Sequence, residues 1–198
     1  MSNFSNGNSD SDLFRVISGG AAGTEMPAFS ERFDGDGIWR LITYIRSVSG
    51  KPVPALRGDR AFGEKLFWGK GGCGACHRVS GKGGRMGPDL SLAGRQRSLA
   101  YLKESLIAPN AALTPGYPTI TVVTKDGKQI MGTQRGYDGF SAQLMDSSEN
   151  FHSYLRDEVA GMKREFKSLM PSNYGKQFSS AEIDHLLVYI TSLRGGKQ

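Results

Sequence analysis

The apolar positions of this chain follow a helical period in its first and last parts and an alternating period between them. A helix is predicted within residues 13–50, after a shorter one, because four apolar residues fall on one face: Ile38, Leu41, Ile42 and Ile45. Another helix is predicted over about residues 60–69, with Asp59 as its N-cap and with Gly63 and Phe67 one turn apart. Both ends of the chain are therefore predicted to be helical.

The alternating part lies at about residues 118–165. Two runs rich in β-branched residues, 119–124 and 128–133, flank the dipeptide Asp126-Gly127, which is the strongest short-range signal for a hairpin. Residues 140–145 and 151–155 are further strand candidates, joined by a turn at 147–150. We therefore predict a mainly α protein with a β-strand insert.

An internal repeat relates the two helical parts. Met26-Pro27 recurs as Met170-Pro171 at an offset of 144, and seven further identities follow at an offset of 145. These identities pair Phe33, Ile38, Leu41, Tyr44, Ile45, Ser47 and Gly50 with Phe178, Ile183, Leu186, Tyr189, Ile190, Ser192 and Gly195. Residues 13–50 therefore repeat the C-terminal part of the second unit.

The repeat divides the chain into segments. Residues 1–12 are rich in Ser, Asn, Asp and Gly and are expected to form a disordered lead-in. Residues 13–50 form a partial unit, the paired prolines in residues 51–57 stiffen a linker, and residues 58–198 form the second unit. No run approaches the roughly 18 apolar residues that a membrane span needs.

The candidate chemistry lies in Cys73-Gly74-Ala75-Cys76-His77, which contains both cysteines of the chain. Cys-x-x-Cys-His is the attachment signature of a covalent c-type haem, in which the thiols bind the two vinyl groups and the histidine ligates iron. The alternatives are a thioredoxin-like redox pair and half of a zinc site. The first requires a βαβ context and the second requires two more ligands at metal-site spacing, and neither pattern is present.

The flanking residues resemble known families. Residues 13–50, with Gly-Thr-x-Met-Pro-x-Phe and the helix that follows, resemble the C-terminal half of a class I cytochrome c without its Cys-x-x-Cys-His half. Residues 58–195 resemble the haem-binding domains associated with quinoprotein (PQQ) sugar dehydrogenases. This second resemblance rests on Gly87-Pro88-Asp89-Leu90, Gly94-Arg95, the run from Tyr101 to Asn110 and Pro115-Gly116-Tyr117. It implies a cytochrome c fold in which the β insert precedes the distal iron ligand.

The resemblance also implies roles for single residues. The Pro88 carbonyl should accept a hydrogen bond from the second nitrogen of His77, and Met170 occupies the place of the sixth iron ligand. Met26 carries the same Met-Pro signature and is the rival, although it belongs to the first unit. The other internal methionines are disfavoured as ligands: Met86, because it is too close to His77, and Met131, Met145 and Met162, because they lack this context. The two remaining histidines are disfavoured because His185 lies on the final helix, where it is solvated or caps a helix, and His152 lies on a predicted strand.

The resemblance implies packing as well. The helix with Gly63 and Phe67 should cross the final helix at Tyr189, although ordinary core packing explains these residues equally well. The apolar face of the first unit is expected to be covered by residues 51–198 or by another chain, because such a patch is a liability in a soluble protein. This face consists of Ile38, Trp39, Leu41, Ile42 and Tyr44.

These features favour an electron-transfer cytochrome with one covalent haem c, ligated by His77 and Met170, rather than an enzyme. The alternatives are a haem enzyme or gas sensor with an open distal site, and a haem-anchored module that binds a partner. A net charge of +6 favours an acidic redox partner, possibly a quinoprotein dehydrogenase, and no nucleic-acid-binding signature accompanies the charge. Covalent haem implies a periplasmic or otherwise exported protein, although residues 1–12 lack the pattern of a signal peptide.

Overall fold

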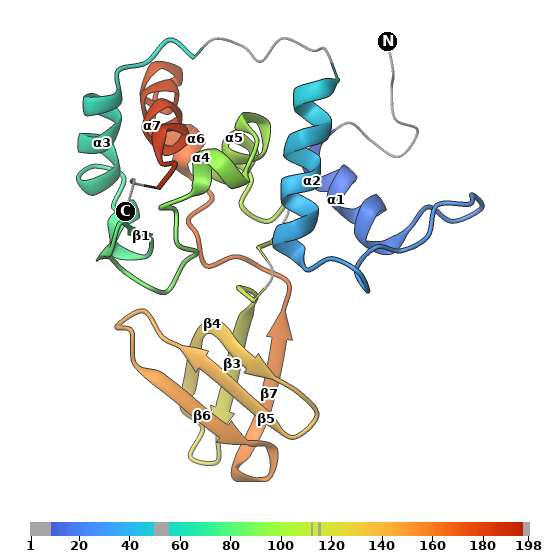
Figure 1. Cartoon of the computed structure of the whole chain (residues 1–198). Coiled ribbons are helices and arrows are strands. Elements are labelled where there is room, and N and C mark those ends of the chain that lie inside the picture. The colour runs from blue at the N-terminus through green and yellow to red at the C-terminus, as the bar shows by residue number, and fades with distance from the viewer. Residues whose placement is uncertain (1–8, 50–55, 112, 115, 196–198) are drawn as a thin grey trace.

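The computed structural model describes residues 9–49, 56–111, 113–114 and 116–195 (Figure 1). The structure is 39% helical and 20% strand, and it contains a five-stranded antiparallel sheet. The expectation of a mainly α protein is therefore wrong. The alternating segment is the reason, because it forms a complete sheet with an apolar cluster of its own.

Seven α-helices are described: α1 (Asp10–Gly19), α2 (Gly35–Val48), α3 (Arg60–Trp68), α4 (Ala93–Gln96), α5 (Leu99–Ile107), α6 (Tyr174–Gln177) and α7 (Ser180–Ser192). The five longer ones each begin after a side chain that accepts a backbone N–H bond: Ser9, Asp34, Asp59, Ser98 and Ser179. Asp59 is thus confirmed as an N-cap. Because Ser9 caps α1, the lead-in expected at residues 1–12 is corrected: its last three residues lie in a helix, and residues 1–8 lie outside the described residues.

The sheet has the strand order β6-β5-β4-β3-β7, with all neighbouring strands antiparallel. Its strands are β3 (Thr119–Thr124), β4 (Gln129–Tyr137), β5 (Ser141–Met145), β6 (Phe151–Leu155) and β7 (Val159–Glu165). The predicted hairpin is confirmed: Asp126-Gly127 joins β3 to β4, and Gly127 has a φ of 85°, which a glycine adopts without steric cost. The apolar cluster of the sheet consists of Ile120, Val122, Ala142, Leu144 and Val159.

The helices of the second unit pack around a crossing of α3 and α7. A Cβ atom at Gly63 would collide with the carbonyl oxygen of His185 and would lie 2.9 Å from the Cβ of Tyr189. Phe67 is fully buried, with its ring centroid 5.4 Å from that of Tyr189. The predicted crossing is therefore confirmed, and glycine is required there because the two backbones approach closely.

The first unit packs against the second, as expected. Its buried residues belong to the same apolar cluster as those of the second unit, and the ring centroids of Trp39 and Tyr101 lie 4.0 Å apart. The buried carboxylate of Asp10 accepts a hydrogen bond from Arg46 Nε at 2.7 Å and another from the Ser98 hydroxyl at the start of α5. Residues 51–198 do not cover the whole apolar face of the first unit, however, because Leu41 and Tyr44 are exposed.

Candidate cofactor and metal site

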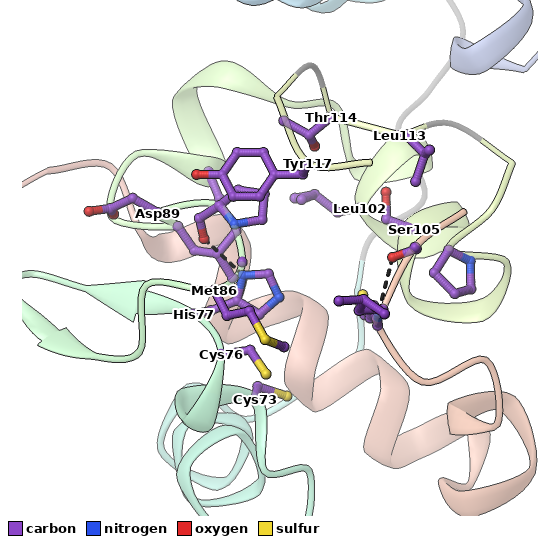
Figure 2. A pocket seen from close by; sticks show the side chains of 18 of the residues that line it. Cys73, Cys76, His77, Met86, Asp89, Leu102, Ser105, Leu113, Thr114 and Tyr117 are labelled. Carbon is purple, nitrogen blue, oxygen red and sulfur yellow. Dashed lines mark hydrogen bonds between the residues drawn. The ribbon is translucent and has the colours of Figure 1, made fainter. Parts of the chain in front are cut away.

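A cavity lies between the Cys-x-x-Cys-His loop, α5 and the segment that precedes α6 (Figure 2). Its wall contains all five residues expected at the site: Cys73, Cys76, His77, Pro88 and Met170. Leu102, Leu113 and Leu169 add apolar surface, and polar side chains such as Ser105 and Thr114 make up the smaller part of the exposed wall. The cavity is therefore suited to a large, mostly apolar ligand that is held by a small number of specific groups.

The motif loop has the local structure that its sequence dictates. Gly72 adopts a left-handed conformation with a φ of 59°, and the short 3-10 helix Cys73–Ala75 follows it. The His77 backbone N–H donates to the Cys73 carbonyl oxygen at 2.9 Å, which closes one turn around the motif. This turn places both thiols and the imidazole on the same cavity wall (Figure 2).

The two thiols are free rather than joined in a disulfide. Burial raises the pKa of Cys73 to about 11, and burial together with the charge of Glu149 raises the pKa of Cys76. Both groups are therefore neutral thiols at neutral pH. A thioredoxin-like pair requires a lowered thiol pKa, so the effect of burial on these two thiols has the wrong sign for that alternative.

The His77 ring has one nitrogen engaged by the protein. Its Nδ1 lies 2.8 Å from the Pro88 carbonyl oxygen, so this nitrogen carries the proton and donates it, as expected. Burial lowers the pKa of His77, an effect that the bond to Pro88 partly offsets, and the imidazole is therefore neutral at neutral pH. Nε2 has no hydrogen-bond partner among the described residues and keeps its lone pair for a metal ion.

Two methionines line the cavity, Met170 and Met86. Met170 precedes α6, and its backbone N–H donates to the Ser168 hydroxyl at 3.0 Å. Met86 lies beside His77, because its neighbour Gly87 packs on the imidazole; a Cβ at Gly87 would lie 2.7 Å from His77 Cε1 (Figure 2). Met86 is thus on the histidine side of the cavity. This position agrees with the reason for which Met86 is disfavoured as the distal ligand, its closeness to His77 in the chain.

The other candidate ligands lie elsewhere. Met26 packs at the margin of the apolar cluster and does not line the cavity. His152 Nε2 is 2.7 Å from an Asp146 carboxylate oxygen, and His185 Nδ1 accepts the Asp59 backbone N–H at 2.6 Å. Both histidines are engaged in structural contacts away from the cavity.

Sequence reasoning missed two polar residues of the cavity wall, Arg97 and Tyr174. Arg97 is held by Asp36 of α2 at 2.7 Å, with its guanidinium over the rings of Trp39 and Tyr101. The Tyr174 hydroxyl donates to the Gly71 carbonyl oxygen at 2.9 Å, and burial raises its pKa to about 12. Nothing in the linear sequence pairs Arg97 with Asp36, because 61 positions separate them.

The sheet contacts the motif loop through the turn between β5 and β6. Glu149 accepts the Arg85 backbone N–H at 2.5 Å and the Arg85 Nε–H at 3.1 Å. These bonds lower the pKa of Glu149. Arg135 of β4 adds a hydrogen bond to the Arg85 carbonyl oxygen. The β insert therefore holds the loop that follows the Cys-x-x-Cys-His motif.

Comparison with known families agrees with this geometry. The family model described as Cytochrome c matches residues 60–147. The match implies a covalently bound haem c with iron. No curated protein matches the chain.

The residues present fit this cofactor. Two neutral thiols, a neutral imidazole with a free nitrogen and a thioether converge on one largely apolar cavity, which is the donor set that a c-type haem uses. The match to the Cytochrome c model supports a haem-binding electron-transfer protein and suggests a redox protein as its partner. Among the described residues, no helix is long and apolar enough to cross a membrane.

Proposed function

We propose that this chain carries electrons through a single haem c bound to Cys73 and Cys76, with His77 and Met170 as the two axial iron ligands. The observation that supports this most directly is the shared cavity: both thiols, the free nitrogen of His77 and the Met170 side chain line it, whereas Met26 does not. Each thiol forms its thioether by adding S–H across a vinyl double bond, so attachment requires no oxidant.

The protein residues have separate tasks in this proposal. The Pro88 carbonyl fixes the His77 ring and increases its basicity as a ligand. Met170 supplies a thioether, which stabilises ferrous iron and raises the reduction potential relative to a second imidazole. The Ser168 hydroxyl and the fixed φ of Pro171 hold the backbone of Met170. His77 and Met170 would thus hold the iron from the protein side, and the bound haem would supply one-electron redox chemistry.

The partner we propose is a protein with an acidic surface, possibly a quinoprotein dehydrogenase in the periplasm. Three basic residues near the motif are neutralised within the chain, since Lys70, Arg85 and Arg97 pair with Glu182, Glu149 and Asp36. Lys65, Lys82 and Arg95 are exposed and have no ion pair among the described residues. Their charge favours steering of an acidic partner toward the haem site.

The ligand assignment is tested by replacing each Met-Pro methionine in turn. Met170→Ala should abolish the weak long-wavelength band of a ferric iron–thioether bond, lower the reduction potential and admit carbon monoxide to the reduced protein. Met26→Ala is the matched control and should change none of these. If Met170→Ala leaves the band intact, or if the unmodified protein binds carbon monoxide rapidly, the proposed ligation is wrong.

A further inference from the structure

The internal repeat places α2 and α7 in the same register over their whole length. At the offset of 145, the cap Asp34 corresponds to the cap Ser179, and the first residue of α2, Gly35, corresponds to the first residue of α7, Ser180. The structure therefore contains two copies of one helix. Within the part of the chain that the structure describes, α3 packs against α7 and not against α2 (Figure 1).

Burial differs between the two copies on two sides of the helix, and on one of them Trp39 is buried in α2 whereas its counterpart Asp184 in α7 is half-buried. Ile38 and Ile42 of α2 are as buried as their counterparts Ile183 and Leu187 in α7. On the other face, Leu41, Tyr44 and Val48 are 37%, 63% and 62% exposed, whereas their counterparts Leu186, Tyr189 and Leu193 are 0%, 2% and 8% exposed. We call Leu41, Tyr44 and Val48 the open stripe of α2.

In α7 the corresponding face lies against α3. Gly63 of α3 lies against the His185 carbonyl and the Tyr189 Cβ, and the Phe67 ring packs on the Tyr189 ring. The Arg60 guanidinium lies 5.7 Å from the centroid of the same ring. Tyr44 is the equivalent of Tyr189, so the open stripe presents the same aromatic residue at the same place in its helix.

The methionine turn of the first unit is also preserved. The Met26 backbone N–H donates to the Thr24 hydroxyl at 3.2 Å, and the Met170 N–H donates to the Ser168 hydroxyl at 3.0 Å. Thr24 and Ser168 are related by the offset of 144 that also relates the two methionines. The first unit therefore keeps both features by which the second unit faces α3 and the cavity.

We propose that the open stripe of α2 docks a helix of the α3 type, with a glycine at the crossing and an aromatic residue four positions later. The occupant is the N-terminal half of a further cytochrome c domain, which carries its own Cys-x-x-Cys-His haem. Met26 becomes the methionine ligand of that second haem. This choice of occupant follows from the repeat, because the equivalent face of α7 is filled by α3.

The inference takes from the proposed function only that this fold holds a haem with a methionine ligand. A second copy of residues 56–92, which contain α3 and the motif loop, is fused by a flexible linker in front of the full chain. The linker raises the effective concentration of the added helix to about the millimolar range. Haem content is measured by mass under denaturing conditions, and the iron–thioether band is measured on the ferric protein.

We expect two haems and about twice the band intensity of the unfused chain. Met26→Ala in the fusion should halve this intensity, whereas the same change in the unfused chain has no effect. Two matched controls, Tyr44→Asp in α2 and Gly63→Val in the added copy only, should each remove the Met26-dependent half. Chemical labelling of Tyr44 should fall severalfold in the fusion and not in the Gly63→Val control.

Three results would overturn the inference. The first is a second haem without a Met26-dependent band, while Tyr44 stays accessible to labelling. The second is replacement of α3 on α7 by the added helix, in which case the whole band depends on Met170. The third is an unfused chain that forms a dimer and that Tyr44→Asp makes monomeric, which would make a second copy the occupant. Dependence of the unfused band on Met170 is checked separately, so failure of the proposed ligation is distinguished from failure of this inference.

Discussion

Trp39 is the side chain that joins the first unit most closely to the cavity wall. Its side chain is 1% exposed, its ring centroid lies 4.6 Å from that of Phe14, and it lies 4.0 Å from that of Tyr101, which lines the cavity. A buried tryptophan removes roughly 150–250 Å² from water, and its replacement by alanine typically costs about 3–5 kcal/mol in a core. We therefore expect Trp39→Ala to destabilise the whole protein.

The size of the effect can be predicted and measured. For a chain of this length, 1 kcal/mol corresponds to about 2–4 °C, so the melting temperature should fall by roughly 6–20 °C. Urea unfolding of the haem-loaded protein, followed by circular dichroism and by the haem absorbance, should show one transition in both signals because the two units share one apolar cluster.

Tyr44→Ala is the matched control, since it truncates another aromatic residue of α2 that is 63% exposed. Its effect should stay within about 0.5 kcal/mol. Equal effects of the two changes would refute the observed packing of α2. The same conclusion would follow if Trp39→Ala altered helix content without moving the haem transition, because the units would then unfold independently.

Two further predictions concern the motif loop and the partner. The pKa of Glu149 is lowered in the folded protein, so its bonds to Arg85 stabilise the loop above the ordinary glutamate pKa of about 4.3 and are lost as the pH falls toward the folded pKa. Hydrogen exchange at the Arg85 amide should therefore accelerate in acid, and Glu149→Ala, which removes the acceptor, should show weak protection already at neutral pH; an unchanged Arg85 amide in that variant would contradict the contact. Lys82→Glu should lower the association rate with an acidic redox partner and leave the reduction potential nearly unchanged, whereas Lys128→Glu, in the distant β3–β4 turn, should have a smaller effect. Rates that do not depend on salt in either variant would exclude steering.

Much of the site was determined by short stretches of sequence. The turn around Cys73 and His77 closes through bonds within five residues, and the Asp126-Gly127 hairpin depends on one dipeptide. The contact between Gly63 and Tyr189 was available from the resemblance to class I cytochromes c. The helix caps follow the same logic, because a side chain that bonds a backbone N–H three residues later needs no tertiary partner.

The tertiary structure decided what linear patterns do not contain. The β insert was expected, but not its completion into a five-stranded sheet with its own cluster, because strand pairing between β3 and β7 joins residues about 40 positions apart. The pattern of α2 likewise predicted a single apolar face, whereas the structure buries Trp39 and exposes Tyr44. Amphipathic periodicity shows which residues favour burial, but burial itself depends on which element is present to cover each side of the helix.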